Sequence, residues 1–501
     1  MIKPKLWSGA IPQDRGLRTF FTSSFIYFSM IALVIALPLG GVAIAMVFDG
    51  KFGHLGIYLL AGIVGAIISA IIIILRQDEL AVVVILAVHL YVDFYAALYI
   101  LAQIMALALL VIFFLGRSHR YPWVEPGALW LWFLFLTLTL IPSINGALNV
   151  DDALNYYPNV ILGAFMMFWL GLLLGRDMLS IRRFFVMLSV FGTLIALHTI
   201  LQAVFGSTFL QLQHAATFLT SITAYQLGTN AGVYRSGSFF LDPNWNGTFL
   251  AVMLFIPLGL FFEGAQLLKR VFYLTEAFII LLALFFTYSA GASVAALVGV
   301  LAFIIFLGRV RYRLQFALVI IIAALVMFVY FPLQVSLLLQ HGSDPSELAI
   351  RGGAWRTALG VIQANPLAGI GLGHQVYQER AEPYRLAASA MQLDHPHNSY
   401  LEWGAMAGLP VLLVFLALVV FALYKALRNW IGADPETRSL LGAGIASIVV
   451  LSVNSWSING WTLPPIAAVG WMILGVISSP FLAKRRMVKW GERDKSSMSV
   501  P

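Results

Sequence analysis

The sequence contains no cysteine and few charged residues. Without a thiol in its 501 residues, the chain forms no disulfide and performs no thiol chemistry, a composition compatible with an oxidising compartment. Charged residues make up only 10% of the chain, whereas soluble domains average about 25%. Hydrophobic residues make up 61%, and the mean hydropathy is +0.91. The composition therefore excludes a water-soluble globular protein.

Long apolar runs dominate the chain instead. The stretch "LGIYLLAGIVGAIISAIIIIL" (55–75) is as long as the roughly 20 residues that a helix needs to cross a bilayer, and similar runs recur. The sequence therefore predicts an all-α, polytopic integral membrane protein. The basic residues of segment 1–19 precede a span too long for the core of a cleavable signal peptide, so we expect the first helix to act as its own insertion signal.

The net charge of +8 reflects short basic clusters between the apolar runs, which indicates membrane topology rather than binding to nucleic acid. The segments expected in the cytoplasm are 1–19, 76–79, 117–120, 176–183, 263–270, 309–313, 425–438 and 484–495. Each interval can hold two crossings, although 80–116, turning near 89–95, is tight. We expect 12–14 transmembrane helices, cytoplasmic termini, and two long outward loops with short helices at 207–243 and 339–400.

The stretch "IRGGAWRTALGVIQANPLAGIGLGH" (350–374) predicts a short helix followed by a glycine turn. Four residues share one face of this helix: Arg351, Trp355, Ala358 and Ile362. Asn365 and Pro366 end the helix, and the glycines of 369–373 permit close backbone approach. The helix is too short and too charged to span the membrane, so it is expected to lie flat on the outer surface. Arg351 could present its guanidinium to a phosphate or anchor the helix among lipid headgroups.

Further along, "LDHPHNSYLEWG" collects titratable side chains. His395 and His397 could bind a metal with Asp394 or His374, although their spacing matches no standard zinc arrangement. A histidine general base is a second interpretation. Third, His397 and Asn398 at the start of the next helix could bind an anion. The simplest interpretation is a helix cap.

The other outward loop ends in "YRSGSFFLDPNWNGTFLA" (234–251). Asp242-Pro243-Asn244 is a turn signal before a new span, which Asn244 or Asn246 is expected to cap. Arg235 lies just outside that span, where it could contact a phosphate or a lipid headgroup. Of the few ionisable residues in apolar runs, only His198 is embedded, and a transporter or pump usually has more.

Together these stretches resemble the bacterial O-antigen ligase and polymerase family. The resemblance rests on "RSGSFFLDPN", "RGGAW…NPLAGIGLG" and "HNSYLEWGAMAGLP", in this order, over about residues 230–410. It predicts three parts: N-terminal membrane helices (1–206), a ligase- or polymerase-like core (207–427), and C-terminal helices with a basic tail (428–501). A further arginine of the family pattern falls on "TYSAGASV", where this chain has Ala290.

The resemblance implies an inverting glycosyltransferase in the bacterial inner membrane, with its site on the outer face. It would move a glycan from an undecaprenyl diphosphate carrier to a hydroxyl of a glycolipid, glycan or protein acceptor, without metal or other cofactor. By position, Arg351 would hold the diphosphate, and His397 would perform acid–base or leaving-group chemistry. The expected substrate-binding residues are Arg235, Arg356, Trp355, Asn398, Tyr400 and Asn244, with Arg235 or Arg356 as substitutes for the arginine missing at Ala290.

Two other functions stay open at this point. A polytopic transporter or lipid flippase would place polar residues in a midplane cavity rather than in outer loops. A non-catalytic member of an envelope-polysaccharide complex is the second alternative, because the loss of a charge-clamp residue at Ala290 removes transition-state stabilisation. The sequence does not distinguish a ligase from a polymerase.

Overall fold

The computed structural model describes most of the chain after residue 77. The described residues are 78–89, 106–107, 110, 126–147, 156–205, 235–240, 242–263, 266–330, 332, 335–336, 338–339, 345–385, 395–480 and 482. Several expected features lie outside them: the span at 55–75, the turn after His89, most of the outward loop 207–243, Asp394 and the basic tail.

Every regular element among the described residues is a helix, which confirms the predicted all-α fold class. The helices are α2 (Asp78–His89), α4 (Pro126–Ala147), η2 (Tyr157–Leu162), α6 (Gly163–Leu174), α7 (Met178–Phe205), η3 (Ser238–Phe240), α9 (Pro243–Met253), α10 (Phe255–Glu263), α11 (Leu267–Phe286), α12 (Ala290–Phe306), α13 (Val310–Tyr330), α15 (Pro345–Ala364), α16 (His374–Arg380), η4 (Glu382–Tyr384), α17 (Ser399–Ala407), α18 (Leu409–Ile431), α19 (Pro435–Asn454) and α20 (Pro464–Ser478). Within this part of the chain, 6 helices are long and apolar enough to cross a membrane. The protein is therefore polytopic, and the total of 12–14 spans stays a prediction.

The bundle has an enclosed centre and an apolar outside. The span Pro243–Glu263, formed by α9 and α10 in succession, is 89% buried. In contrast, α4, α13 and α18 expose large apolar side chains, among them Trp130 (68%), Leu314 (76%) and Leu413 (64%). Exposed apolar surface of this extent is typical of contact with lipid. These three helices therefore form part of the lipid-facing rim around the central span.

Glycines let the central helices approach closely. Where α6 meets α20, a Cβ on Gly171 would overlap the Met472 carbonyl, and one on Gly475 would overlap the Phe168 carbonyl. Small residues at such crossings allow backbone contact between membrane helices, where van der Waals packing drives association. The close approach of these two helices thus follows from two glycines.

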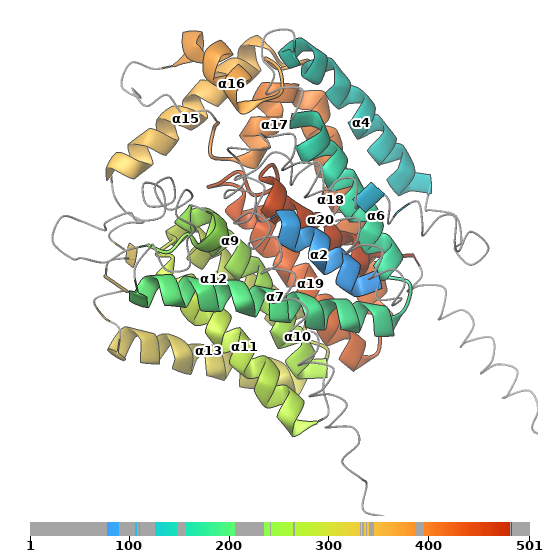
Figure 1. Ribbon diagram of the computed structural model, residues 1–501, viewed down its shortest axis with the longest axis vertical. Helices are drawn as coiled ribbons and strands as arrows, with labels where there is room; N and C mark the ends of the chain where they lie inside the picture. Colours follow the sequence, from blue (N-terminus) through green and yellow to red (C-terminus); the bar gives the residue numbers. More distant parts are fainter. Residues whose placement is uncertain are drawn as a thin grey trace, which may run out of the picture.

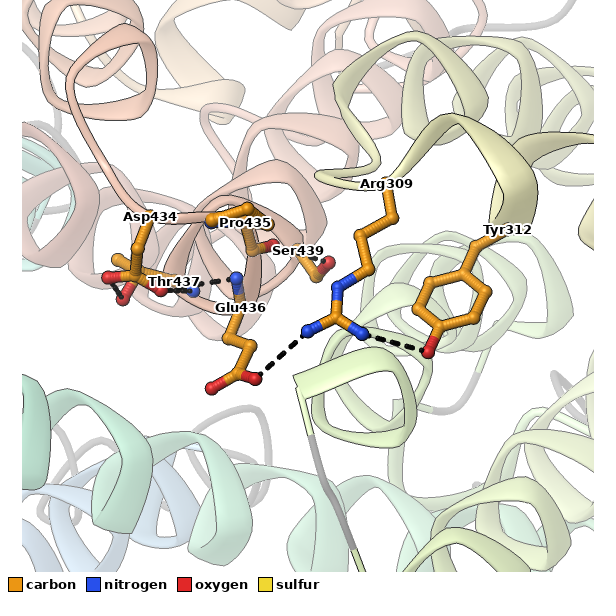
Figure 2. A network of polar contacts seen from close by, with 7 residues as sticks. All are labelled: Arg309, Tyr312, Asp434, Pro435, Glu436, Thr437 and Ser439. Carbon is orange, nitrogen blue, oxygen red and sulfur yellow. Dashed lines mark hydrogen bonds and ion pairs between the residues drawn. The ribbon is translucent and has the colours of Figure 1, made fainter.

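One end of the bundle carries ion pairs between segments that the sequence assigns to the cytoplasm. Arg309 pairs with Glu436 at 3.1 Å and hydrogen bonds to the Tyr312 hydroxyl at 3.3 Å (Figure 2). Asp434 caps α19 beside this pair, accepting from the backbone NH groups of Glu436 and Thr437. Because the Arg309–Glu436 pair is exposed, it contributes at most about 1 kcal/mol, and its main significance is that it joins two charged loops.

Helices α12 and α19 run antiparallel and connect this charged end to the opposite one. At the charged end Gly308 lies against Pro435, and at the other end Gly291 lies against Asn454 and Ser457. The sequence segments that carry the family resemblance gather at this second end. Helices α15 and α16 lie beside α17 at the upper edge of the molecule in Figure 1, outside the central bundle.

Candidate functional site

The turn between α19 and α20, residues 455–462, holds the start of α17 in place. The backbone NH of Ser399 donates to the Ser455 carbonyl at 3.0 Å, and the Asn398 side chain donates to the Trp456 carbonyl at 3.0 Å. The Trp461 NH in turn donates to the Ser399 hydroxyl at 3.0 Å. This turn belongs to the part expected to supply only membrane helices and a tail, so its contact with "HNSYLEWG" was missed from the sequence.

The same end of α19 also contacts the first resemblance segment and the turn before α12. Asn454 donates to Thr248 of α9 at 2.6 Å. A Cβ on Gly291 would lie 2.6 Å from the Ser457 hydroxyl and 2.9 Å from the Asn454 carboxamide oxygen, so a side chain there would push α12 away from α19. Segments distant in the sequence thereby meet around the end of α19.

Arg235 is buried at this meeting point, with 5% of its surface exposed. Its Nε donates to the Thr287 carbonyl at 3.0 Å, and its Nη2 donates to the Asn244 carboxamide oxygen at 2.7 Å. Thr287 lies three residues before Ala290. The structure therefore brings the Arg235 guanidinium to the turn that lacks the expected arginine, and ties that turn to the start of α9.

Beneath Arg235, a buried polar network fixes the segment 235–240. Gln202 of α7 accepts hydrogen bonds from the Ser236 hydroxyl at 2.9 Å and from the Ser238 NH at 3.0 Å. His198, one turn earlier, lies 2.8 Å from the Ser238 hydroxyl and stacks on Phe239. The embedded histidine thus contacts the loop through a ring nitrogen and a ring face.

The expected cap of α9 was assigned to the wrong residue. Asp242 is the N-cap: its carboxylate accepts from the NH of Asn244 at 2.6 Å and from that of Trp245 at 3.4 Å. Pro243 occupies the first helical position. The backbone NH at this position has no partner within the helix, so proline loses no hydrogen bond there. The prediction that Asn244 or Asn246 caps this helix is therefore wrong, and Asn244 instead accepts from Arg235.

Helix α15 forms over Pro345–Ala364 and ends before Asn365 and Pro366, as the sequence predicted. Ala358 and Val361 are fully buried, and Ile362 packs against Gly404 of α17. Arg351 is partly exposed and makes no hydrogen bond or ion pair to any described residue. Its charge is therefore not neutralised by this part of the protein.

Trp355 and Arg356, on the same helix, differ in their surroundings. The ring of Trp355 is partly buried, and its indole nitrogen is fully buried without a hydrogen-bond partner in the described chain. Arg356 is exposed. Of these two, Trp355 is the one whose polar atom lies inside the protein.

No hydrogen bond or ion pair joins Arg351 to His397 within the described chain. Helix α15 meets α17 near Ile362, eleven residues beyond Arg351, which corresponds to about 16 Å along the helix axis. Figure 1 shows α15 running from its end near α17 outward to the edge of the bundle. The C-terminal ends of α15 and α17 meet here, and Arg351 and His397 both lie toward the opposite ends of these helices.

The glycine turn after α15 closes the far end of α17. Ile370 and Gly371 donate from their backbone NH groups to the carbonyls of Ala405 and Met406, both at 3.0 Å. Gly369 has φ +62° and lies so close to Met406 that a Cβ would overlap its backbone. The glycines predicted to permit close approach therefore have a structural role at the helix end.

His397 and Asn398 start α17 in different ways. His397 is a non-glycine residue with φ +50°, in the left-handed region that side chains rarely adopt. Asn398 is the N-cap, accepting from the NH groups of Tyr400 at 3.0 Å and Leu401 at 3.1 Å. Tyr400 donates to the Ser452 carbonyl at 2.7 Å, and burial raises the pKa of its hydroxyl to about 12. The capping interpretation of Asn398 thus agrees with its contacts.

Non-glycine residues with left-handed backbone lie together at this end of the described bundle. Among the described residues, the non-glycine residues with positive φ are Ser238, Tyr288 and His397, which lie one each in the three segments gathered around α19. Left-handed backbone at non-glycine residues costs about 1–3 kcal/mol each and concentrates at functional sites. These three residues therefore identify this end of the bundle as a candidate site.

Three imidazoles form a row from His397 through the buried His395 to the partly exposed His374. The rings of His397 and His395 lie 4.2 Å apart, and those of His395 and His374 stack at 5.0 Å. His374 Nε2 lies 3.2 Å from Glu402 Oε1. Among the described residues no group of three or more His, Asp or Glu is arranged to hold a metal ion, and Asp394, one ligand of the alternative metal site, lies outside them.

Glu402 is the residue that sequence reasoning missed. It is fully buried, and burial alone raises the pKa of its carboxyl group. Hydrogen bonds from His374 and Thr462, together with the charges of the His374 and His395 imidazoles, outweigh burial and hold the pKa below its usual value. In the sequence, Glu402 shows only as an acidic residue one turn after the cap Asn398 of an otherwise apolar helix. This pattern alone does not indicate a functional role.

These observations define an all-α, multi-pass membrane protein with a strained, polar site at one end of its bundle. Residues 277–416 match the family model described as O-antigen ligase, which confirms the resemblance predicted from the sequence over this part of the chain. The match includes Arg351, His397 and Glu402 but not Arg235 or the 455–462 turn. No curated protein matches the chain. The family implies a glycan-transferring role at a membrane, with a lipid-linked glycan and an acceptor as partners.

Proposed function

We propose that the protein transfers a glycan from an undecaprenyl diphosphate carrier to an acceptor hydroxyl at the outer face of the bacterial inner membrane, with inversion at the anomeric carbon. The observation that supports this most directly is His397: a partly exposed imidazole in a strained conformation, within the family domain. An imidazole titrates near neutral pH and is therefore suited to proton transfer.

In this reaction the acceptor oxygen forms a bond to the anomeric carbon while the bond from that carbon to the phosphate oxygen breaks. The electron pair of the broken bond stays on the diphosphate, and the hydroxyl proton goes to a ring nitrogen of His397. The leaving diphosphate gains negative charge, which a guanidinium stabilises through paired, charge-assisted hydrogen bonds. Arg351 fits this role because no described residue neutralises it.

The remaining predicted residues take supporting roles in the proposal. Asn398 and Tyr400 fix the start of α17, through the cap and the bond to Ser452, and thereby position His397. Arg235 and Asn244 hold the Ala290 turn, and a phosphate contact by Arg235 stays a prediction. Trp355 and Arg356 follow Arg351 by about one turn on α15, where they would contact the donor. The proposal includes no metal or other cofactor.

The test is a transfer assay on purified protein with a carrier-linked glycan and an acceptor. We expect Arg351→Ala and His397→Ala each to reduce transfer by about 100-fold or more, the usual contribution of a general base or a charge-stabilising group. Arg428→Ala is the control, because this exposed arginine bonds only to Tyr424 on its own helix within the described chain, and it should retain full activity. Full transfer by either site variant, or movement of the lipid without transfer, contradicts the proposal.

Ligase and polymerase activities differ in the product that a deletion strain accumulates. Surface glycans with single repeats but no long chains would indicate a polymerase. Complete chains that stay on their carrier would indicate a ligase. Restoration of the normal pattern by the wild-type gene, but not by the His397→Ala variant, would link the result to the proposed site.

A further inference from the structure

Glu402 lies at the centre of a buried hydrogen-bond cluster that the proposed transfer step does not itself require. Its Oε1 accepts from the Tyr156 hydroxyl at 2.8 Å and faces His374 Nε2 at 3.2 Å, and its Oε2 accepts from the Thr462 hydroxyl at 2.8 Å. The side chain has no exposed surface. A carboxylate in this position is compensated by three hydrogen-bonding groups from three different parts of the chain.

The histidine row connects this carboxylate to the proposed base. His374 contacts Glu402 directly, His395 is buried between its two neighbours, and His397 is partly exposed at the far end. The rings of His374 and His395 stack, and those of His395 and His397 are tilted by 50°. At these distances a charge on one imidazole acts on its neighbours.

The carboxylate determines where the first proton of this set is bound. An imidazolium at His374 is in contact with the negative charge, whereas one at His397 is two rings away. Once His374 is charged, repulsion opposes a second positive charge on the nearby rings. The ion pair has its positive end toward His395 and His397, so its net effect on His397 is to disfavour protonation.

We propose that Glu402 is a positioning residue for glycan transfer: it keeps the first proton of the histidine row on His374 and so leaves His397 neutral, able to accept the proton of the acceptor hydroxyl. This inference rests on the proposed function. After transfer, the partly exposed His397 returns its proton to solvent, and His374 stays charged throughout.

Several ionisable groups lie near Glu402 besides His397. Among the described residues they are Tyr156 directly before η2, Tyr377 on α16, and His374 and His395. The charge of Arg385, after η4, acts on Tyr377. Burial raises the pKa of Tyr377 above its usual range, so this phenol stays neutral.

The experiment compares Glu402→Gln with wild type in the transfer assay across pH 5–9. Glutamine keeps the size and a hydrogen-bond acceptor but removes the charge, so His397 would take up the first rather than the second proton of the row. We expect kcat at neutral pH to fall by about tenfold or more, KM for the carrier-linked donor to change by less than about twofold, and the acid limb of the pH–rate profile to move to higher pH.

Glu276→Gln is the matched control. Glu276 is equally enclosed, with 3% exposure, but it bonds to Ser189 between α11 and α7, away from the site. This variant should keep the wild-type profile. If Glu402→Gln does not accumulate in the membrane, His374→Gln provides the second test, because it removes the site of the first proton and should shift the acid limb in the same direction.

The outcomes separate this inference from the proposed function. An unchanged kcat and acid limb in Glu402→Gln, alongside an inactive His397→Ala, overturns only the role of Glu402. An equal loss in Glu402→Gln and Glu276→Gln without movement of the acid limb also overturns it, because it indicates a purely structural effect. Full activity in His397→Ala overturns the proposed function and this inference together.

Discussion

At the scale of single residues, Arg235 shows how one planar side chain can join three segments. Its guanidinium bonds at once to the Thr287 carbonyl before α12 and to Asn244 in the first turn of α9. Two donors in fixed directions are needed for this, and a lysine ammonium on a flexible stem does not reproduce them. The contacts support a framing role for Arg235 at the turn where the family arginine is replaced by Ala290.

Arg235→Lys is therefore expected to destabilise the protein even though the charge is kept. The loss of one charge-assisted hydrogen bond in a buried site costs about 1–3 kcal/mol, which thermal unfolding of the detergent-solubilised protein would measure. Arg428→Lys, on the exposed face of α18, is the matched control and should leave the midpoint unchanged. Equal midpoints for Arg235→Lys and wild type would show that the two hydrogen bonds are not needed for stability.

Single residues were predictable where their role is local. The sequence correctly ended α15 at Asn365-Pro366 and offered Asn398 as a cap, because both depend on neighbours within a few positions. Glu402 was missed because its partners Tyr156 and Thr462 lie 246 and 60 positions away. No local pattern specifies which distant groups will surround a buried carboxylate.

At the scale of elements, the end of α17 depends on the glycine turn that follows α15. The NH groups of Ile370 and Gly371 satisfy carbonyls at the last turn of α17, and the Leu409 NH donates back to the Pro366 carbonyl at 2.8 Å. The two segments thus interlock through their backbones. The sequence predicted a flexible turn here but not its partner, because backbone pairing between distant segments leaves no mark in side-chain periodicity.

A pair of glycine substitutions tests this interlock. Gly369→Ala is expected to destabilise the protein, by about 1–3 kcal/mol from the strained φ alone, and further because the added Cβ would overlap Met406. Gly352→Ala, in α15 with no atom within 4 Å of the added Cβ, should instead stabilise by about 0.5–1 kcal/mol. Both are measured by thermal unfolding. Similar midpoints for the two variants would mean that the turn can move away from α17 at little cost.

At the scale of the whole molecule, the protein has two chemically different ends. Loops rich in arginine and acidic residues meet at one end, as in Arg309–Glu436 and Arg182–Glu263, the latter at 3.2 Å. The strained segments, the histidine row and Glu402 occupy the other end. The positive clusters in the sequence predicted which loops share a side, since the rule behind them depends only on charge. They could not predict how the outer segments fit together around α19.

The absence of cysteine allows a direct test of which end faces outward, because each introduced cysteine is the only thiol in the chain. Gln363→Cys places it on the exposed face of α15, and Glu436→Cys places it at the charged end, where the glutamate is 58% exposed. In spheroplasts, a membrane-impermeant maleimide should label the first variant and not the second, and permeabilisation should make the second reactive. The cysteine-free parent controls for background labelling. The reverse pattern would put His397 in the cytoplasm, away from a donor presented at the outer leaflet. It would therefore contradict the proposed function.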